Sequence, residues 1–545
     1  MPHIEFRPET PARQPEGAEN YGLPWRDLAF PQELLDRHGA TVLDPSTAPL
    51  DEGERRPDST VYRTNVLLIP AQVLDRNGLG WINEQLAAIG LAIVSYDTSA
   101  DDHDERPRWH AAVLGVAKQG KDVVVDAWRA LRVLRRALAD FPDSRRKEYL
   151  AKIALDHLLV GSAFAGAGAG ISGEPATSGH GVPDLGGFAT PTGGYARTPV
   201  TVVAGPPARR PEADIGGRRP VLVIPDTGLP RQGHSWFLPV TTPDSFLSVS
   251  VEAQKSIEAA VDTALRTTKM PAARLVGYEE VTAPPNPLLG TPSSQTGHGL
   301  MQAGLVCQIA PDAKVLMLRV MYADGVVVEA ALHAALDHVF KKIQAGFFVD
   351  VVTFACGYFH ETADDEAFTP TLMEKINHLR ERGVVVVAAA GNYASNRAFW
   401  PGAGAKDGLR NLALAPMLAV GAKNPDGTVA IFSNEHEAIQ WLAPGAAVVS
   451  TFPPGIKGSG APDLRPPDVH PPGRASFDRD NYNEFATWSG SSFAVPILGA
   501  AIMALMIEDF QTLDLPVTDA QTAIARAHRV VGKLRAGILP EITPI

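Results

Sequence analysis

The sequence predicts an α/β protein: a three-layer α/β/α domain with a mainly parallel sheet, preceded by a small α+β domain of ferredoxin-like order. Two observations carry this prediction. After residue 219, short runs rich in Val, Ile and Leu alternate with helical patterns. Strands that are apolar on both faces belong to parallel sheets that helices cover on both sides. Before residue 161, the patterns follow the order β-α-β-β-α-β, which is typical of the ferredoxin-like motif.

The first 160 residues divide into an arm and a folded part. Residues 1–60 are polar and rich in Pro, Glu and Arg, so we expect a mostly irregular arm with one short helix near residues 31–38. In residues 61–160, apolar runs predict strands and amphipathic stretches predict helices. The expected elements, in chain order, are a strand at 66–69, a helix at 81–89, strands at 91–94 and 109–116, a helix at 123–138 and a strand at 155–160.

Residues 161–218 are rich in Gly, Ala, Pro, Ser and Thr and are interpreted as a linker. The run 168–173 matches GxGxxG, but Glu174-Pro175 follows it in place of a helix, which favours the linker over a nucleotide-binding loop. The remaining residues, 219–545, form the predicted larger domain. Two long Pro-rich inserts, near 230–292 and 455–483, are expected to build extra surface loops or to restrict access.

The larger domain takes its elements from the alternation of apolar runs and helical patterns. The expected strands are residues 221–224, 315–320, 349–356, 384–390 and 418–420. The expected helices are residues 254–266, 300–309, 329–345 and 372–382.

Composition excludes several classes of protein. The 545 residues include 49 Lys and Arg against 61 Asp and Glu, a net charge of −12, which argues against a nucleic-acid binder with a broad basic field. The two cysteines, Cys307 and Cys356, exclude a disulfide framework and are expected to be buried thiols. The start lacks the pattern of a secretory signal, and no apolar run approaches 18 residues, so we expect a cytoplasmic protein that does not span a membrane.

Four segments carry residues that suit nucleophilic catalysis. Asp226 ends an apolar strand, His298 lies between glycines at the start of a helix, and Ser492 lies in a Gly/Ser turn before an apolar helix. A serine hydroxyl needs an adjacent base, His suits that role, and a carboxylate behind the His holds its tautomer. Asn392 follows a strand and Gly391, where its amide can stabilise an oxyanion.

These segments resemble the motifs of the subtilisin-like serine proteases, or subtilases, in which the triad follows the order Asp, His, Ser. The resemblance covers residues 219 to about 512. It rests on Asp226-Thr227-Gly228, Gly297-His298-Gly299 with Ala303-Gly304, Ala389-Ala390-Gly391-Asn392, and Ser489-Gly490-Ser491-Ser492-Phe493-Ala494-Val495-Pro496. Ser491 stands where the family has Thr, Phe493 where it has Met, and Met301 where it has a second His.

The resemblance implies a serine endopeptidase with the triad Asp226, His298 and Ser492 and with Asn392 in the oxyanion hole. It implies a substrate-binding edge at Gly391 and at Cys356, Gly357 and Tyr358, where Tyr358 replaces a glycine of the family and narrows the pocket. The implied substrate is a peptide or protein, and no cofactor is required. Subtilases often bind structural calcium, but the sequence identifies no site for it.

The resemblance also implies a role for residues 61–160, because a prodomain of this order often precedes subtilases and covers their cleft. We therefore expect a zymogen, or a protease under the control of a regulatory protein partner. The alternative is that residues 61–160 form an appended binding domain.

Other interpretations stay open at this point. A non-catalytic, subtilase-like scaffold that binds peptides would share the same motifs. An aspartic protease would pair Asp226 with Asp97, because two carboxylates must share a proton. His180, in a second Gly-His-Gly, competes with His298 for the role of base, and Ser491 competes with Ser492 for the role of nucleophile. His234 is interpreted as a structural or rim histidine.

Overall fold

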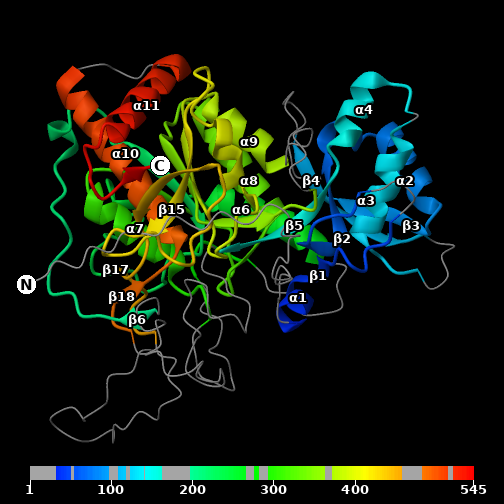
Figure 1. Cartoon of the computed structure of the whole chain (residues 1–545), viewed down its shortest axis with the longest axis horizontal. Helices are drawn as coiled ribbons and strands as arrows, with labels where there is room; N and C mark the ends of the chain where they lie inside the picture. Colours follow the sequence, from blue (N-terminus) through cyan, green and yellow to red (C-terminus); the bar gives the residue numbers. More distant parts are fainter. Residues whose placement is uncertain are drawn as a thin grey trace, which may run out of the picture.

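The structure is a computed structural model of the chain (Figure 1). It describes residues 32–50, 55–96, 108–117, 123–139, 141–161, 197–265, 275–280, 293–362, 371–456, 482–513 and 519–545. The GxGxxG run, Asp97 and His180 lie outside these residues, as do most of the predicted linker and most of the insert near 455–483.

A mainly parallel sheet forms the centre of the larger unit. In the described residues it has eight strands in the order β19-β16-β15-β13-β11-β7-β9-β8, and only the pairing of β16 with β19 is antiparallel. The strands are β7 (Val221–Asp226), β8 (Leu247–Val249), β9 (Lys314–Arg319), β11 (Val351–Phe354), β13 (Val385–Ala389), β15 (Met417–Lys423), β16 (Ile439–Pro444) and β19 (Thr543–Pro544).

Helices cover both faces of this sheet (Figure 1). One layer holds α7 (His298–Ile309), α10 (Ser491–Leu513) and α11 (Ala520–Arg535), and the other holds α6 (Val251–Leu265), α8 (Glu329–Gln344) and α9 (Thr371–Arg380). Along β13, Val385 and Val387 pack into the first layer, while Val386 and Ala388 pack into the second. The predicted three-layer α/β/α class is therefore confirmed.

Helix α10 is the apolar centre of the first layer. It is long and apolar enough to cross a membrane, but 89% of its most apolar window is buried inside the protein. Burial to this extent is typical of a helix in the core of a folded domain.

The smaller unit lies beside the larger one and is drawn in blue and cyan in Figure 1. Its elements are β2 (Thr60–Pro70), η1 (Ala71–Val73), α2 (Arg76–Ala87), β3 (Leu91–Tyr96), β4 (Trp109–Val116), α3 (Ala127–Ala137), α4 (Ser144–Ala151) and β5 (Ala154–Gly161). The strands lie in the antiparallel order β5-β2-β4-β3. The predicted succession of elements is present, with α4 as an addition. The interpretation of this unit as a prodomain stays a prediction.

The arm is more ordered than expected between residues 32 and 43. Helix α1 (Gln32–His38) is followed by β1 (Ala40–Leu43), which pairs with β2. Leu34 and Leu35 of α1 are buried against the second layer of the larger unit. The mostly polar composition of residues 1–60 gave no indication of these few apolar contacts.

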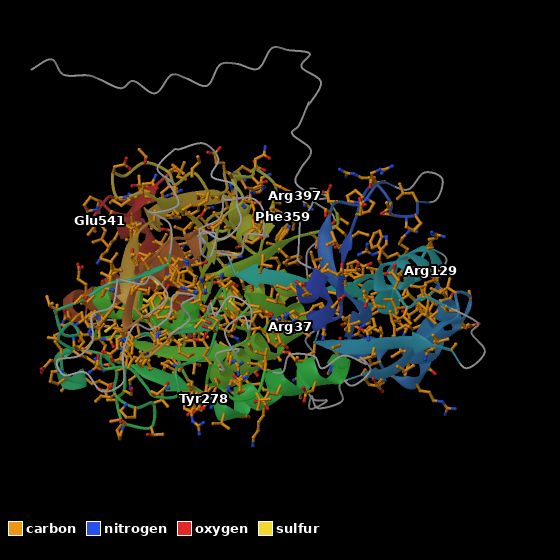
Figure 2. The ribbon with its side chains drawn as sticks, turned by 90° about the horizontal axis from the view of Figure 1, so that it is seen from below. Arg37, Arg129, Tyr278, Phe359, Arg397 and Glu541 are labelled. Atoms are coloured by element: carbon orange, nitrogen blue, oxygen red, sulfur yellow. The ribbon has the colours of Figure 1, made fainter. Side chains whose placement is uncertain are left out.

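Strand β5 joins the two units. Beyond its pairing with β2, it pairs antiparallel with β10 (Val326–Val328) on one side and with β12 (Cys356–Phe359) on the other. Arg37 forms an ion pair with Asp324 at this junction, and the guanidinium of Arg397 donates a 2.6 Å hydrogen bond to the carbonyl oxygen of Ser59; Arg37 and Arg397 are labelled in Figure 2. The smaller unit is thus attached through backbone pairing as well as side chains.

The run 349–356, expected as one strand, is divided at Ala355. Its first part is β11 of the parallel sheet, whereas the chain after Ala355 turns to pair with β5 and with β14 (Phe399–Trp400) as β12. The remaining elements are β6 (Thr198–Pro199), β17 (Val448–Thr451) and β18 (Phe485–Trp488), which form a small sheet, and η2 (Glu212–Asp214) and η3 (Gly402–Asp407).

Candidate active site

Asp226 and His298 form a buried pair at the carboxyl edge of the parallel sheet. Asp226 is the last residue of β7, and His298 is the first residue of α7. The Nδ1 of His298 lies 2.8 Å from the Oδ1 of Asp226, and both side chains are buried. An imidazole held in this way by a carboxylate presents its Nε2 for proton transfer.

Local backbone geometry brings the two residues together. Gly297, before His298, has φ 81°, and an added Cβ there would meet the ring of Phe452 at 2.6 Å. The hydroxyl of Thr227 accepts a 2.9 Å hydrogen bond from the amide of Gly299, which ties the loop after β7 to the first turn of α7. Only glycine fits such a close turn with positive φ.

Gln302 is a polar neighbour that the motif analysis missed. It lies one turn after His298 on α7, and its Nε2 donates a 2.8 Å hydrogen bond to the Oδ2 of Asp226. The Oδ1 of Asp226 also accepts a 2.8 Å hydrogen bond from the amide of Thr227. Both carboxylate oxygens therefore have donors. The spacing of four residues from His298 was the available signal, because it places Gln302 on the same helix face.

Asn392 and the start of α10 lie together. The Oδ1 of Asn392 accepts a 2.9 Å hydrogen bond from the amide of Ser491. In the part of the chain that the structure describes, the buried Nδ2 of Asn392 has no hydrogen-bond partner. Gly490 packs so close that an added Cβ would lie 3.3 Å from this Nδ2. An amide donor thus lies beside the helix N-terminus that carries Ser492.

Among the described residues, Ser492 is not hydrogen-bonded to His298. Its Oγ donates to the carbonyl oxygen of Ala355 at 3.3 Å, and the Nε2 of His298 has no partner there. The rings of Phe493 and Trp488, which flank Ser492 in sequence, lie 5.3 and 5.6 Å from the imidazole ring. Ser492 is fully buried, as is His298. The hydrogen bond between serine and histidine that a catalytic relay requires is therefore not formed in the described residues.

Three of the predicted substrate-binding residues, Cys356, Gly357 and Tyr358, lie along β12, and β5 pairs with the first two. Cys356 pairs with Gly161, and Gly357 pairs with Val160. The Tyr358 ring stacks on His157 of β5, with ring centres 4.6 Å apart. Gly391, with φ 98°, lies next to Asn392, and its amide donates to the hydroxyl of Ser491 at 3.2 Å.

Two further ionisable residues lie near this site. Glu280 is buried, and its carboxyl accepts hydrogen bonds of 2.9 and 3.1 Å from the amide of Gly297. Burial raises the pKa of Glu280 to about 8. Arg197 donates to the carbonyl oxygens of Ser294 and Thr296, at 2.9 and 3.2 Å, and so supports the loop before His298. Neither residue belongs to a recognisable motif.

The two cysteines are free, buried thiols, and burial raises the pKa of both.

His234 hydrogen-bonds the carbonyl oxygen of Glu484 at 2.8 Å, in keeping with a structural role. It also lines a cavity of about 700 Å³ together with Leu229, Tyr278 and Leu300. Part of the insert near 230–292 therefore forms a cavity wall next to the loop after Asp226.

The described residues also hold a group of side chains that could bind a metal ion. The side chains of His157, His360 and Glu361 offer three ligand atoms within 4.8 Å of one another. All three residues are buried.

Comparisons with known proteins relate part of the chain to one family. Residues 277–535 match the Subtilase family, peptidase S8. This range includes His298, Asn392 and Ser492, whereas Asp226 precedes it. The thermophilic serine proteinase of Bacillus sp. (strain AK1) is 26% identical over 171 residues, which are 30% of this chain and 37% of that protein. Subtilisin BL of Lederbergia lenta is 27% identical over 177 residues, 30% of this chain and 57% of its own.

The chain thus spans less than two thirds of the length of these relatives. Among solved structures, the prenylagaramide maturation protease PagA is 19% identical, with a TM-score of 0.34 over 57% of this chain and 83% of the other. A cold-adapted subtilisin-like serine proteinase is 16% identical, with a TM-score of 0.33 over 57% and 81%.

Proposed function

We propose that this chain, whose residues 277–535 form a domain of the subtilase family, is a serine endopeptidase that hydrolyses peptide bonds in peptides or proteins. The observation that carries the proposal is the buried pair of Asp226 and His298, 2.8 Å apart, beside the helix N-terminus that bears Ser492. The assigned roles are nucleophile for Ser492, base for His298, orienting carboxylate for Asp226 and oxyanion donor for Asn392.

The reaction follows from these roles. Ser492 Oγ turns from the carbonyl of Ala355 toward His298 and attacks the scissile carbonyl carbon, while its proton passes to the Nε2 of His298. The Nδ2 of Asn392 and the amide of Ser492 donate to the oxyanion. His298 then gives the proton to the leaving amine, and an acyl-enzyme remains. Water attacks this ester by the same relay and releases the acid, with no cofactor in any step.

The proposal includes restraint by the smaller unit, which makes the full chain a zymogen. Strand β5 fills the position between β10 and β12, so a substrate backbone cannot pair with either strand while β5 is in place. The burial of His298 and Ser492 supports the same proposal. Removal of β5, by cleavage in residues 162–196 or by a regulatory protein partner, would free both strands. Cytoplasmic location is part of the proposal and rests on the sequence alone.

Covalent labelling tests the catalytic part of this proposal. We would insert a recognition sequence for a site-specific protease after residue 175 and measure reaction with a fluorophosphonate probe before and after cutting. We expect labelling to increase after the cut, to disappear in Ser492→Ala and to persist in Ser491→Ala. Absence of labelling in every state would support the non-catalytic scaffold instead.

The aspartic-protease alternative has little support from the geometry. Both carboxylate oxygens of Asp226 accept hydrogen bonds, from His298, Thr227 and Gln302, and none of these partners is a carboxyl group. That alternative predicts loss of activity in Asp97→Asn and full activity in Ser492→Ala, which is the reverse of our expectation.

A further inference from the structure

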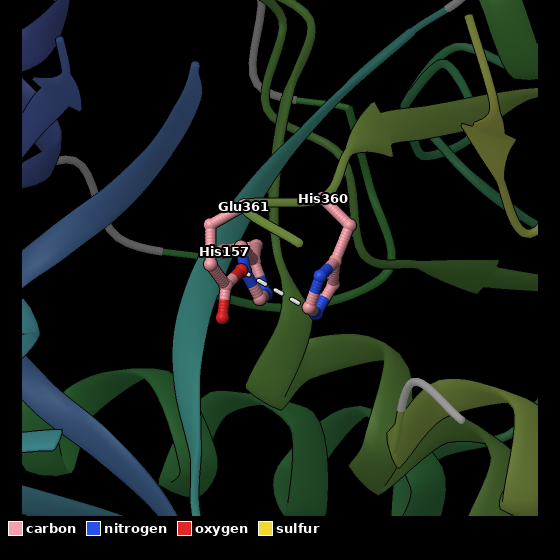
Figure 3. A group of neighbouring side chains, drawn as sticks. All are labelled: His157, His360 and Glu361. Carbon is pink, nitrogen blue, oxygen red and sulfur yellow. Dashed lines mark hydrogen bonds and ion pairs between the residues drawn. The ribbon is translucent and has the colours of Figure 1, made fainter. Parts of the chain in front are cut away.

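Three side chains that the proposed mechanism does not use meet at the junction of the two units. His157 comes from β5 of the smaller unit, whereas His360 and Glu361 directly follow β12 of the larger one. Figure 3 shows the two imidazole rings and the carboxylate converging on one point. A cluster assembled from both units depends on their association, so any ligand it binds links them.

The distances in this cluster suit a small metal ion. The Nε2 of His157 lies 2.8 Å and the Nε2 of His360 lies 3.3 Å from the Oε2 of Glu361. Zinc takes such ligands at about 2.0–2.2 Å in tetrahedral geometry, which places neighbouring ligand atoms about 3.3 Å apart. The two nitrogen–oxygen distances therefore lie within about 0.5 Å of this spacing, and all three ligand atoms lie within 4.8 Å of one another.

Partners on the other ring nitrogens orient both histidines. The Nδ1 of His157 lies 2.7 Å from the Oε2 of Glu329, and the hydroxyl of Thr371 holds the other oxygen of Glu329 at 2.9 Å. The Nδ1 of His360 lies 2.8 Å from the hydroxyl of Thr362. A carboxylate behind a ligating imidazole is the usual support of a zinc-bound histidine, because it fixes the tautomer and raises the basicity of the ligand.

Burial and one aromatic contact complete the cluster. All three side chains are buried, and the Tyr358 ring covers one face of His157. Two imidazoles and one carboxylate are borderline ligands that suit zinc better than calcium or magnesium, which prefer oxygen ligands only. Three protein ligands leave the fourth position of a tetrahedron for water.

We propose that His157, His360 and Glu361 bind one Zn²⁺ ion, which locks β5 against β12. Binding requires that His360 present the Nε2 lone pair, with its Nδ1 proton donated to Thr362 Oγ1. The Thr362 amide, which donates to that same Nδ1 at 3.1 Å, then loses its acceptor. Metal binding does not depend on catalysis. Its consequence for activity rests on the proposed function, since the lock would hold β5 in the substrate position.

The competing state holds a proton where we place the metal. A protonated His157 between the carboxylates of Glu329 and Glu361 makes the same two short contacts, and Arg135 lies 3.3 Å from the other oxygen of Glu361. Such an ion pair needs no ion from solution, so metal content separates the two states.

The first experiment measures zinc in the full chain carrying Ser492→Ala, which prevents self-cleavage. After expression with zinc and dialysis against metal-free buffer, we expect about one Zn²⁺ per chain. His157→Gln and His360→Gln should lose it, whereas His338→Gln, which alters a buried histidine outside the cluster, should keep it. Zinc below about a tenth of an equivalent in the parent chain, or unchanged zinc in His157→Gln, would overturn the proposal.

Co²⁺ provides a measurement that does not need folded variants. Titration of the metal-free parent chain with Co²⁺ should give the intense visible absorption of a tetrahedral site, saturating at one equivalent and abolished by zinc. The pale spectrum of octahedral Co²⁺ throughout the titration would contradict the site.

Hydrogen exchange tests the lock itself. At a zinc concentration 100 times the dissociation constant, amides of residues 154–161 that exchange through release of β5 should exchange about 100-fold more slowly than in the metal-free chain. Amides of β3, which has no contact with the cluster, should be unaffected. Zinc bound at one equivalent without slower exchange in β5 would refute the lock. Because the chain carries Ser492→Ala, none of these results depends on the proposed protease activity.

Discussion

Gln302 donates its side-chain amide to the Oδ2 of Asp226 at 2.8 Å, on the opposite carboxylate oxygen from the one that holds His298. The bond fixes the carboxylate plane in a buried site. We therefore expect Gln302 to act, through Asp226, as a positioning residue for the imidazole of His298.

We predict that Gln302→Met lowers kcat and leaves KM nearly unchanged. Methionine keeps the volume of the side chain and removes the donor to a charged, buried acceptor. Hydrogen bonds to charged groups are worth about 1.5–3 kcal/mol, which corresponds to a loss of about 10- to 100-fold. The measurement is peptide hydrolysis by the chain cut after residue 175. The control is Gln308→Met, which alters an exposed residue of the same helix. An equal loss of kcat in both variants would contradict a positioning role for Gln302.

Asp226→Asn should abolish most of the activity while the protein stays folded. The asparagine amide favours the imidazole tautomer with the proton on Nε2, so His298 cannot accept the proton of Ser492. In a triad of this type the loss in kcat is about 10⁴-fold. Turnover should be compared with the thermal midpoint of unfolding. A variant that is correctly folded and retains more than about a tenth of the activity would remove Asp226 from the mechanism.

Asn392 carries two roles that different substitutions separate. Its Oδ1 holds the amide of Ser491, while its Nδ2 is the expected oxyanion donor. Asn392→Asp keeps the acceptor and removes the donor, so kcat should fall at least about 100-fold, as expected for the loss of one oxyanion donor. Asn392→Ala should also weaken the start of α10 and lower the thermal midpoint. Normal kcat in Asn392→Asp would rule out the oxyanion role.

Restraint by β5 predicts a variant with more activity than the parent chain. Val160 pairs with Gly357 in the middle of the three strands, and proline there cannot donate a ladder hydrogen bond. We expect Val160→Pro in the uncut chain to react faster with the fluorophosphonate probe. Val116→Pro alters the end of β4, which pairs within the smaller unit only, and should leave the rate unchanged. Equal rates in Val160→Pro and the parent chain would argue against restraint.

Sequence patterns predicted the parallel sheet and the pair of Asp226 and His298, because both arise from local signals. A buried strand is apolar along its length, and each motif lies within about ten residues of chain. The contacts of β5 with β10 and β12 have no such signal, since they join residues more than 160 positions apart. No local sequence pattern marks His157 as part of a cluster, because its partners Glu329 and Glu361 come from the other unit. Gln302, by contrast, could have been identified from helical spacing alone, because it lies four residues after His298.

The buried Glu280 predicts a pH dependence of stability. Burial raises its pKa to about 8 in the folded protein, from the usual value of 4.5 for this carboxyl group. Between these values the folded state keeps a proton that the unfolded state releases, so the free energy of unfolding should fall as pH rises from 5 to 8, by a few kcal/mol at most. Glu280→Gln keeps an acceptor for the Gly297 amide and cannot ionise. In the Ser492→Ala background, urea unfolding at pH 5 and pH 8 should show a smaller loss of stability for Glu280→Gln than for its parent. The same loss in both proteins would show that Glu280 does not titrate with folding.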